Sequence, residues 1–209
     1  MGFYPLLLEL EGRRCVVVGG GPVGERKVDG LLAVGAAVTV VSPEVTQALA
    51  ALAAAGRITL VHRAYRDGDL EGAALVFTAL SDPRATAVVA DEARRRGIWL
   101  NAADDPAYCS FILPAVVRRG PLTISVASGG ATPALTRALR EHLEGALGPE
   151  WGTLAELAAE ARRELRARGG GADGETWRRA LAADVRALVA EQRLDDARRE
   201  LRARLAMPA

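Results

Sequence analysis

The sequence predicts an α/β protein in which an N-terminal parallel sheet is followed by a small α+β region and a C-terminal helical domain. Three observations support this prediction. Short β-branched runs alternate with amphipathic segments over the first half of the chain. A glycine cluster separates the first such run from the first amphipathic segment. Beyond Pro149 the chain becomes rich in Ala, Leu and Arg.

Composition indicates a globular protein. The 209 residues suffice for one full domain and a smaller one, with 50% hydrophobic and 25% charged residues. The formal net charge of +1 provides no global field for nucleic acid or an anionic membrane, so we expect neither partner. Residues 1–10 lack a basic segment and are interrupted by Pro5 and Glu9, which argues against a signal peptide or a membrane span.

The cysteines and histidines form no recognisable site. Cys15 and Cys109 lie in apolar surroundings and belong to no CxxC pair, so we interpret them as buried thiols of a reducing cytoplasm. His62 and His142 are isolated in the sequence. No spacing is typical of a metal site, and the metal ligands, if any, are unknown from the sequence.

The glycine cluster has the spacing Gly19-x-Gly21-x-x-Gly24, directly after an apolar run at 16–18. In a strand-turn-helix unit this spacing gives a tight turn, close approach of a pyrophosphate and close helix packing. A proline in the first helical turn costs no hydrogen bond, and the helix dipole favours an anion there. The alternative is an ordinary glycine-rich turn. The candidate cofactor-binding residues are Gly19, Gly21, Pro22, Val23 and Gly24.

Periodicity then predicts a helix at 23–34, a strand at 38–41, a helix at about 44–55 and a strand at 58–61. This βαβαβ order predicts a right-handed, Rossmann-like parallel sheet. Ser42, Pro43 and Glu44 follow the second strand and are further cofactor candidates. Glu44 lies 20 positions after Gly24, as a ribose-binding acid does, but it could instead begin the next helix.

The fourth and fifth strands are expected at 74–79 and 98–100, with a helix at 84–96 between them. Thr78 should reach the carboxyl edge of the sheet, where ligands bind, although an ordinary strand end is the alternative. Residues 101–106 form a polar cluster at the same edge. Asp104 and Asp105 suit either acid–base chemistry or a turn before Pro106, and residue type alone favours the turn.

Beyond residue 107 the pattern changes. We expect strands at 111–117, with Pro114 at an edge or bulge, and at 122–127. Thr132 as N-cap and Pro133 predict a helix at 133–146, preceded by glycines that could leave N–H groups open to an anion or form a plain turn. Helices at 150–167 and 174–204 complete the chain. The predicted domains are 1–107 for the cofactor, 108–147 for dimerisation and substrate, and 148–209 for the helices.

In its motifs, the chain resembles the siroheme synthase family, and within it the precorrin-2 dehydrogenase and sirohydrochlorin ferrochelatase module. The matching features occur in the family's order over residues 1–145. They are Tyr4-Pro5-Leu6, Val17 to Gly21 with Glu25-Arg26-Lys27, Asn101 to Asp104, Ser110 to Pro114, and Ser125 to Gly130 with Thr132-Pro133.

The resemblance implies NAD-dependent oxidation of the tetrapyrrole precorrin-2 to sirohydrochlorin, in many members followed by insertion of ferrous iron. It assigns the general base to Asp104, which reverses the preference for a plain turn. The same carboxylate would accept the pyrrole N–H protons when iron enters. Asn101, Ser128, Gly129 and Gly130 are then candidates for the substrate side, and a homodimer is expected.

Two departures from the family pattern affect the prediction. The chain ends at Ala209 without a second glycine-rich domain, so we expect no fused methyltransferase activity. The family's Thr-Asp after the fourth strand is replaced by Leu80-Ser81-Asp82, which weakens the expectation of a cofactor contact there.

The lack of a basic residue after Val41 favours NAD over NADP. An NAD-sensing module without catalysis, and a dehydrogenase of another small substrate, are the alternative functions.

Overall fold

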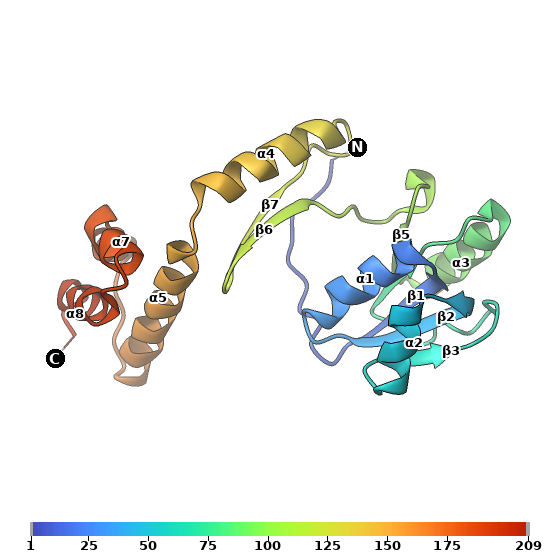
Figure 1. Ribbon diagram of the computed structural model, residues 1–209, viewed down its shortest axis with the longest axis horizontal. Helices are drawn as coiled ribbons and strands as arrows, with labels where there is room; N and C mark the ends of the chain where they lie inside the picture. Colours follow the sequence, from blue (N-terminus) through green and yellow to red (C-terminus); the bar gives the residue numbers. More distant parts are fainter. Residues whose placement is uncertain (1, 208–209) are drawn as a thin grey trace. The chain divides into compact units, whose positions relative to one another are not determined.

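A computed structural model describes residues 2–207 and divides into two compact units, one up to Ile112 and one from Leu113 onward. Each unit is considered by itself below, with the element labels of Figure 1.

The first unit is built on a five-stranded parallel sheet with the order β3-β2-β1-β4-β5 (Figure 1). The central strand β1 carries the run of valines and is buried from Cys15 to Gly20, as a strand covered on both faces must be. The strands are β1 (Arg14–Gly20), β2 (Ala37–Val45), β3 (Thr59–Val61), β4 (Leu75–Thr78) and β5 (Trp99–Ala102).

Three helices cover the two faces of this sheet. Helices α1 (Pro22–Leu32) and α2 (Gln47–Ala54) pack on the face that carries Val17 and Phe77. Helix α3 (Pro83–Arg96) packs on the opposite face, against Val16 and Val76. The alternation of neighbouring valines between the two cores follows from the two-residue period of a strand. The predicted Rossmann-like α/β arrangement is therefore confirmed.

Helix α3 shows why the local sequence folds as it does. Asp82 accepts a hydrogen bond from the N–H of Arg84 at 2.9 Å, and Pro83 occupies the first turn. At the other end Gly97 adopts φ 67°, a left-handed conformation that suits glycine. The cap predicted at Ser81-Asp82-Pro83 is confirmed at Asp82.

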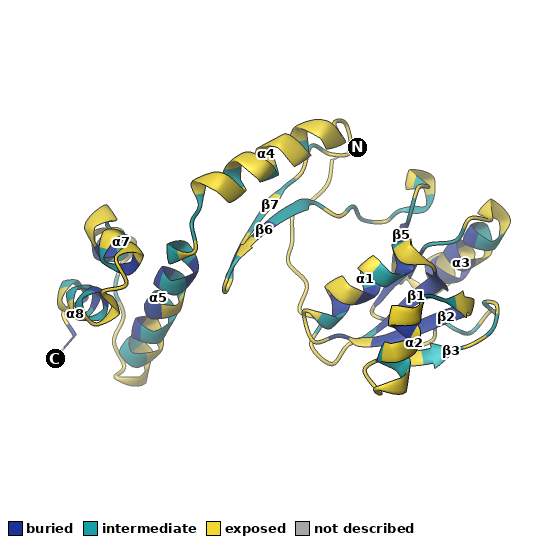
Figure 2. Cartoon of the chain, viewed as in Figure 1, coloured by how far each residue is buried: buried dark blue, intermediate teal, exposed yellow. Residues whose placement is uncertain are grey.

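The second unit starts with an antiparallel hairpin, β6 (Ala115–Arg119) and β7 (Leu122–Val126), and continues with α4 (Pro133–Ala146). Four further helices follow: α5 (Glu150–Ala167), α6 (Gly174–Ala180), α7 (Ala183–Ala190) and α8 (Leu194–Arg204). Their buried side chains form a separate core that includes Leu154, Leu157, Val185 and Leu201. Figure 2 shows that α4, in contrast, is exposed along most of its length.

Two predicted elements differ from the structure. The helix expected at 174–204 is three helices, because the chain turns after Ala180 and again at Gln192, which adopts φ 61°. The strand expected from 111 begins only at Ala115, since Pro114 has no N–H to donate to a sheet. A short 3-10 helix, Pro106–Tyr108, also precedes this strand.

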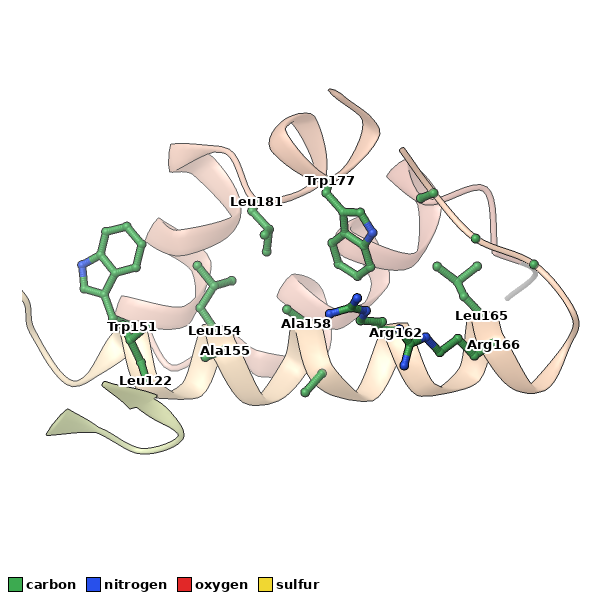
Figure 3. Close-up of a pocket in the computed structure, with 14 residues that line it drawn as sticks. Leu122, Trp151, Leu154, Ala155, Ala158, Arg162, Leu165, Arg166, Trp177 and Leu181 are labelled. Atoms are coloured by element: carbon green, nitrogen blue, oxygen red, sulfur yellow. The ribbon is translucent and has the colours of Figure 1, made fainter. Parts of the chain in front are cut away.

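A groove of about 740 Å³ runs along α5 in the second unit (Figure 3). Trp151 and Trp177 lie along it, with Leu154 and Leu181 between them. Arg162 and Arg166 of α5 line the same groove. Its lining is thus largely apolar, and all of it comes from residues beyond Leu113.

Candidate functional site

The turn between β1 and α1 requires glycine at three positions. A Cβ on Gly19, which has φ 112°, would lie 2.5 Å from the carbonyl oxygen of Ala79. A Cβ on Gly20 would lie 2.4 Å from the carbonyl oxygen of Glu44. A Cβ on Gly24 would lie 2.1 Å from the carbonyl oxygen of Gly19. The first glycine therefore makes the tight turn, and the last one lets α1 pack closely against β1, as the spacing predicts.

Gly21 plays a different part in this turn. Its φ of −76° is open to any residue, and no atom lies within 4 Å of an added Cβ. The space beside it is thus free for a ligand that approaches the backbone. Pro22 occupies the first turn of α1, where the N–H groups of Val23 and Gly24 have no intrahelical acceptor. These donors and the helix dipole together favour an anion.

The end of β2 lies next to this glycine turn. The N–H of Gly20 donates to the Ser42 hydroxyl at 3.0 Å, and that hydroxyl donates to the carbonyl oxygen of Glu44 at 2.6 Å. Ser42 is buried, whereas Pro43 and Glu44 are exposed. Glu44 lies within β2 rather than in the following helix. The hydroxyl of Ser42 therefore shapes the turn, and the side chain of Glu44 is open to a ligand.

Thr78, at the end of β4, contributes a buried hydroxyl to the same edge. Its Cα pairs with Val18 of β1 and with Ala102 of β5. Within residues 2–207, the Thr78 Oγ1 atom has no hydrogen-bond partner although the residue is 1% exposed. A buried hydroxyl without a partner costs free energy, so a polar group from outside the chain would stabilise it.

Asn101 lies at the end of β5 and holds the segment that follows. Its Nδ2 donates to the carbonyl oxygen of Phe111 at 3.1 Å and to the Cys109 sulfur at 3.6 Å. The N–H of Ala102 donates to the same sulfur at 3.2 Å. The side-chain amide nitrogen of Asn101, a buried residue, thus serves the protein itself by holding the segment that follows β5.

Asp104 stands on an exposed turn beyond β5. The turn is fixed to the sheet, because the N–H of Ala103 donates to the carbonyl oxygen of Thr78 at 2.8 Å. Asp104 itself has φ 61°, a left-handed conformation that Asp tolerates better than most residues. A non-glycine residue held in this conformation at the carboxyl edge of the sheet is a reasonable functional candidate.

The Ser128 to Gly130 loop belongs to the second unit. The Ser128 hydroxyl accepts a hydrogen bond from the N–H of Thr132 at 3.0 Å, and the N–H of Ala131 donates to its carbonyl oxygen at 3.2 Å. Gly129 and Gly130 have φ of 64° and 85° with open space beside them. Thr132 is the N-cap residue of α4, as predicted, but its own hydroxyl makes no capping bond.

Comparison with known proteins identifies the family to which the chain belongs. The model of a family described as putative NAD(P)-binding matches residues 6–115, which is more than half of the chain. The chain belongs to this NAD(P)-binding family. The match spans the β1–α1 turn, Thr78 and the residues up to Asp104.

The chain is 38% identical over 203 residues to the siroheme synthase of Methylococcus capsulatus. This alignment covers 96% of the chain and 43% of that protein. The chain is 43% identical over 167 residues to the siroheme synthase of Pseudomonas entomophila, covering 80% and 36%. These similarities confirm the predicted siroheme synthase family. The chain spans less than half the length of these relatives.

A solved structure of SirC, precorrin-2 dehydrogenase, has the same fold. It superposes with a TM-score of 0.75 at 24% identity, covering 94% of this chain and all of the other. The likeness extends over both units. The parallel sheet, the small hairpin and the C-terminal helices are thus a shared architecture.

The residues of this NAD(P)-binding domain fit a dinucleotide. The space beside Gly21, the free N–H groups of α1 and the unpartnered hydroxyl of Thr78 lie at one edge of one sheet. Among residues 2–207 no three His, Cys, Asp or Glu side chains gather as a metal site, and no helix has the length and apolar character needed to cross a bilayer.

Sequence reasoning missed Lys27. This residue of α1 is half-buried, with its ammonium 5.3 Å from the centroid of the Phe77 ring. Burial and the charge of Arg26 lower the pKa of Lys27, against an opposing effect of Cys109 and Asp104. The sequence carries one signal for it, the Glu25-Arg26-Lys27 run of the family resemblance, which gave the lysine no role.

Proposed function

We propose that the protein is an NAD-dependent precorrin-2 dehydrogenase, which oxidises precorrin-2 to sirohydrochlorin. The observation that carries this proposal is the placement of Asp104 on a turn anchored to Thr78, at the sheet edge that also ends in the glycine turn. The kinship with siroheme synthases and the fold shared with SirC support this substrate and reaction.

The cofactor side is assigned to residues of the first unit. When bound, NAD would supply the acceptor for the hydride that the tetrapyrrole loses. The N–H groups at the start of α1 would hold the diphosphate of NAD, and the exposed Glu44 would serve the ribose. The residues concerned are Gly19, Gly21, Pro22, Val23, Gly24, Ser42, Pro43, Glu44 and Thr78.

Asp104 is the proposed general base. As the hydride leaves the substrate, a proton must leave as well, and an exposed carboxylate on a fixed turn can accept it. The same group can accept pyrrole protons when ferrous iron, as second substrate, enters sirohydrochlorin. Asn101 and the Ser128, Gly129 and Gly130 loop are proposed to bind the tetrapyrrole. The N–H and O–H groups of the loop suit its carboxylates, and the side-chain oxygen of Asn101, an acceptor, suits a pyrrole N–H.

A substitution at Asp104 tests this role. Asp104→Asn keeps a residue that tolerates a positive φ but removes the basic carboxylate, so we expect turnover to fall about 100-fold or more. The formation of sirohydrochlorin from precorrin-2 and NAD is followed by absorbance, with and without ferrous iron. Asp105→Asn, on the same turn, is the matched control and should retain activity.

The result separates the proposal from its alternatives. Full turnover in a folded Asp104→Asn protein would remove this residue from the mechanism. If the wild-type protein binds NAD in a calorimeter but neither binds nor converts the tetrapyrrole, a sensing module or a dehydrogenase of another substrate is the better description.

A homodimer is the second part of the proposal. Helix α4 buries none of its residues within the chain, and it exposes Leu135 and Leu139 one turn apart. An apolar stripe on an otherwise polar helix is typical of a surface that a partner covers. A second copy of the chain is the partner we infer.

A further inference from the structure

Lys27 lies in an aromatic setting on α1. Its ammonium faces the ring of Phe77 at 5.3 Å, and that ring meets Phe111 edge to face with centroids 5.6 Å apart. Phe77 belongs to the buried core under α1, so this face of the lysine is shielded from water. An aromatic ring stabilises a cation above it. The ring is a weak hydrogen-bond acceptor, however, and it does not satisfy the three N–H donors of the ammonium.

The ammonium has no anionic partner in the described part of the chain. The arginines of the last turn of α3 and those of α4 form ion pairs with neighbouring carboxylates, such as Arg96 with Glu92 and Arg140 with Glu144. Within residues 2–207 no such pair is formed by Lys27, whose contact is the ring of Phe77. A half-buried cation without an anion is costly, which makes an external anion a stabilising partner.

The surroundings of Lys27 indicate which external anion it would bind. Burial, the largest effect, and the charge of Arg26 lower the pKa of Lys27, and smaller effects of Cys109 and Asp104 oppose them. The ammonium therefore lies within electrostatic reach of the proposed general base. The strand pairing agrees, since Phe77 under the lysine is the Cα partner of Asn101, which holds Cys109 and Phe111.

We propose that Lys27 binds a carboxylate of the tetrapyrrole substrate and thereby orients the macrocycle toward Asp104. This inference rests on the proposed function, because it takes the substrate to be a polycarboxylated tetrapyrrole. A phosphate of the cofactor is the alternative anion that this ammonium could bind. The N–H groups at the start of α1 already provide for that phosphate, whereas the ring under the ammonium belongs to Phe77, which pairs with Asn101 on the strand that leads to Asp104.

The test measures binding of uroporphyrin, a stable tetrapyrrole with eight carboxylates, to the full chain by calorimetry. For Lys27→Met we expect affinity to fall about 10- to 100-fold, the range of one charge-assisted hydrogen bond. Lys27→Arg should restore most of the affinity. Arg26→Met is the matched control, since it removes one positive charge from the next, exposed position of α1 and should change the affinity little.

Further measurements separate the two anions and the two proposals. The affinity of wild-type protein for uroporphyrin should fall more steeply with salt than that of Lys27→Met, while both should bind NAD equally. If Lys27→Met loses affinity for NAD and keeps it for uroporphyrin, the anion is a phosphate and the inference is overturned. Unchanged binding of both ligands also overturns it.

Folding and activity controls complete the design. Lys27→Gln is measured beside Lys27→Met, so that a conclusion is reached if one variant unfolds. The proposed function fails if the wild-type protein makes no sirohydrochlorin from precorrin-2 and NAD. The role of Lys27 fails separately if the wild-type protein makes sirohydrochlorin while Lys27→Met and Lys27→Gln bind uroporphyrin as tightly as the wild type.

Discussion

Gly21 and Gly24 lie three residues apart in one turn, but only Gly24 is crowded by other atoms of the chain. An added Cβ at Gly24 meets the Gly19 carbonyl oxygen at 2.1 Å, whereas at Gly21 it meets no atom of the chain. Gly24→Ala should therefore destabilise the fold, by about 1 to 3 kcal/mol. Gly21→Ala should lower the free energy of unfolding by at most about 1 kcal/mol, because alanine is a weaker N-cap. It should nevertheless weaken NAD binding about 10-fold or more, because the added methyl group fills the space proposed for the ligand.

Chemical denaturation and calorimetric titration with NAD measure the two effects. Gly30→Ala, in the middle of α1 with open space beside it, is the control and should raise stability by up to about 1 kcal/mol without changing NAD binding. A Gly21→Ala protein that binds NAD as tightly as the wild type would show that the phosphates lie elsewhere.

Glu92 is a buried carboxylate that fixes the 65–68 loop to α3. It accepts hydrogen bonds from the Tyr65 hydroxyl, from the N–H of Gly68 at 3.0 Å and from the Arg96 guanidinium at 2.6 Å. Burial raises the pKa of Glu92, but these hydrogen bonds together outweigh it and the net pKa is lowered. The ionised side chain is thus structural rather than catalytic.

The lowered pKa of Glu92 predicts a pH dependence of stability. A carboxyl group with a lower pKa in the folded state stabilises the fold above its unfolded pKa of about 4.3, and this contribution disappears as the pH falls through the folded pKa. Glu92→Gln should cost about 1 to 3 kcal/mol at pH 7, because the amide nitrogen cannot accept the hydrogen bonds that the second carboxylate oxygen takes in this buried position. The loss should shrink toward pH 3, as urea denaturation across that range would measure. An equal loss at pH 7 and pH 3 would contradict this assignment.

At the scale of elements, prediction succeeded where the signal for an element is local. The strand, glycine turn and helix around Gly19 to Gly24 and the Asp82 cap of α3 are each specified within a few residues. The 174–204 segment contains neither glycine nor proline after residue 174, so periodicity alone predicts one long helix. Its turns are set instead by the packing of α6, α7 and α8 in the shared core with α5.

Helix α4 offers a test of the proposed dimer. Glutamates at the exposed Leu135 and Leu139 would place two charges in the apolar stripe, and a dimer held by it should dissociate to monomers. The double variant Leu135→Glu, Leu139→Glu is compared with the wild type by sedimentation velocity. Arg137→Glu lies away from the stripe and should leave the dimer intact. A double variant that remains dimeric would exclude α4 as the interface.

At the scale of the whole molecule, the sequence carries more signal for the proposed cofactor residues than for the proposed substrate residues. The proposed phosphate site, Gly19 to Gly24, is one continuous stretch, and the NAD(P)-binding family model matches residues 6–115 of the chain. The environment of Lys27 depends on Phe77, Asp104 and Cys109, which are far from it in the sequence and meet only through the sheet. No spacing rule brings these residues together, so the lysine and the unpartnered hydroxyl of Thr78 were found from the structure alone.

The two units have separate buried cores, and this predicts different responses to NAD. The first core consists of the sheet and α1 to α3, the second of α5 to α8. A ligand stabilises only the state that binds it, by about 2.7 kcal/mol at a concentration 100 times its Kd. The proposed NAD residues all belong to the first unit. NAD should therefore slow hydrogen exchange in peptides of β1 and β4 and leave peptides of α5 and α8 unchanged.

Mass spectrometry of pulse-labelled protein, with and without NAD, measures both sets of peptides in one sample. Gly21→Ala is the matched control, because it should abolish the protection of β1 at the same NAD concentration while keeping the fold. Equal protection of α5 and β1 would mean that the two cores unfold as one cooperative unit. Protection of α5 without β1 would move the NAD site out of the sheet, and with it the proposed function.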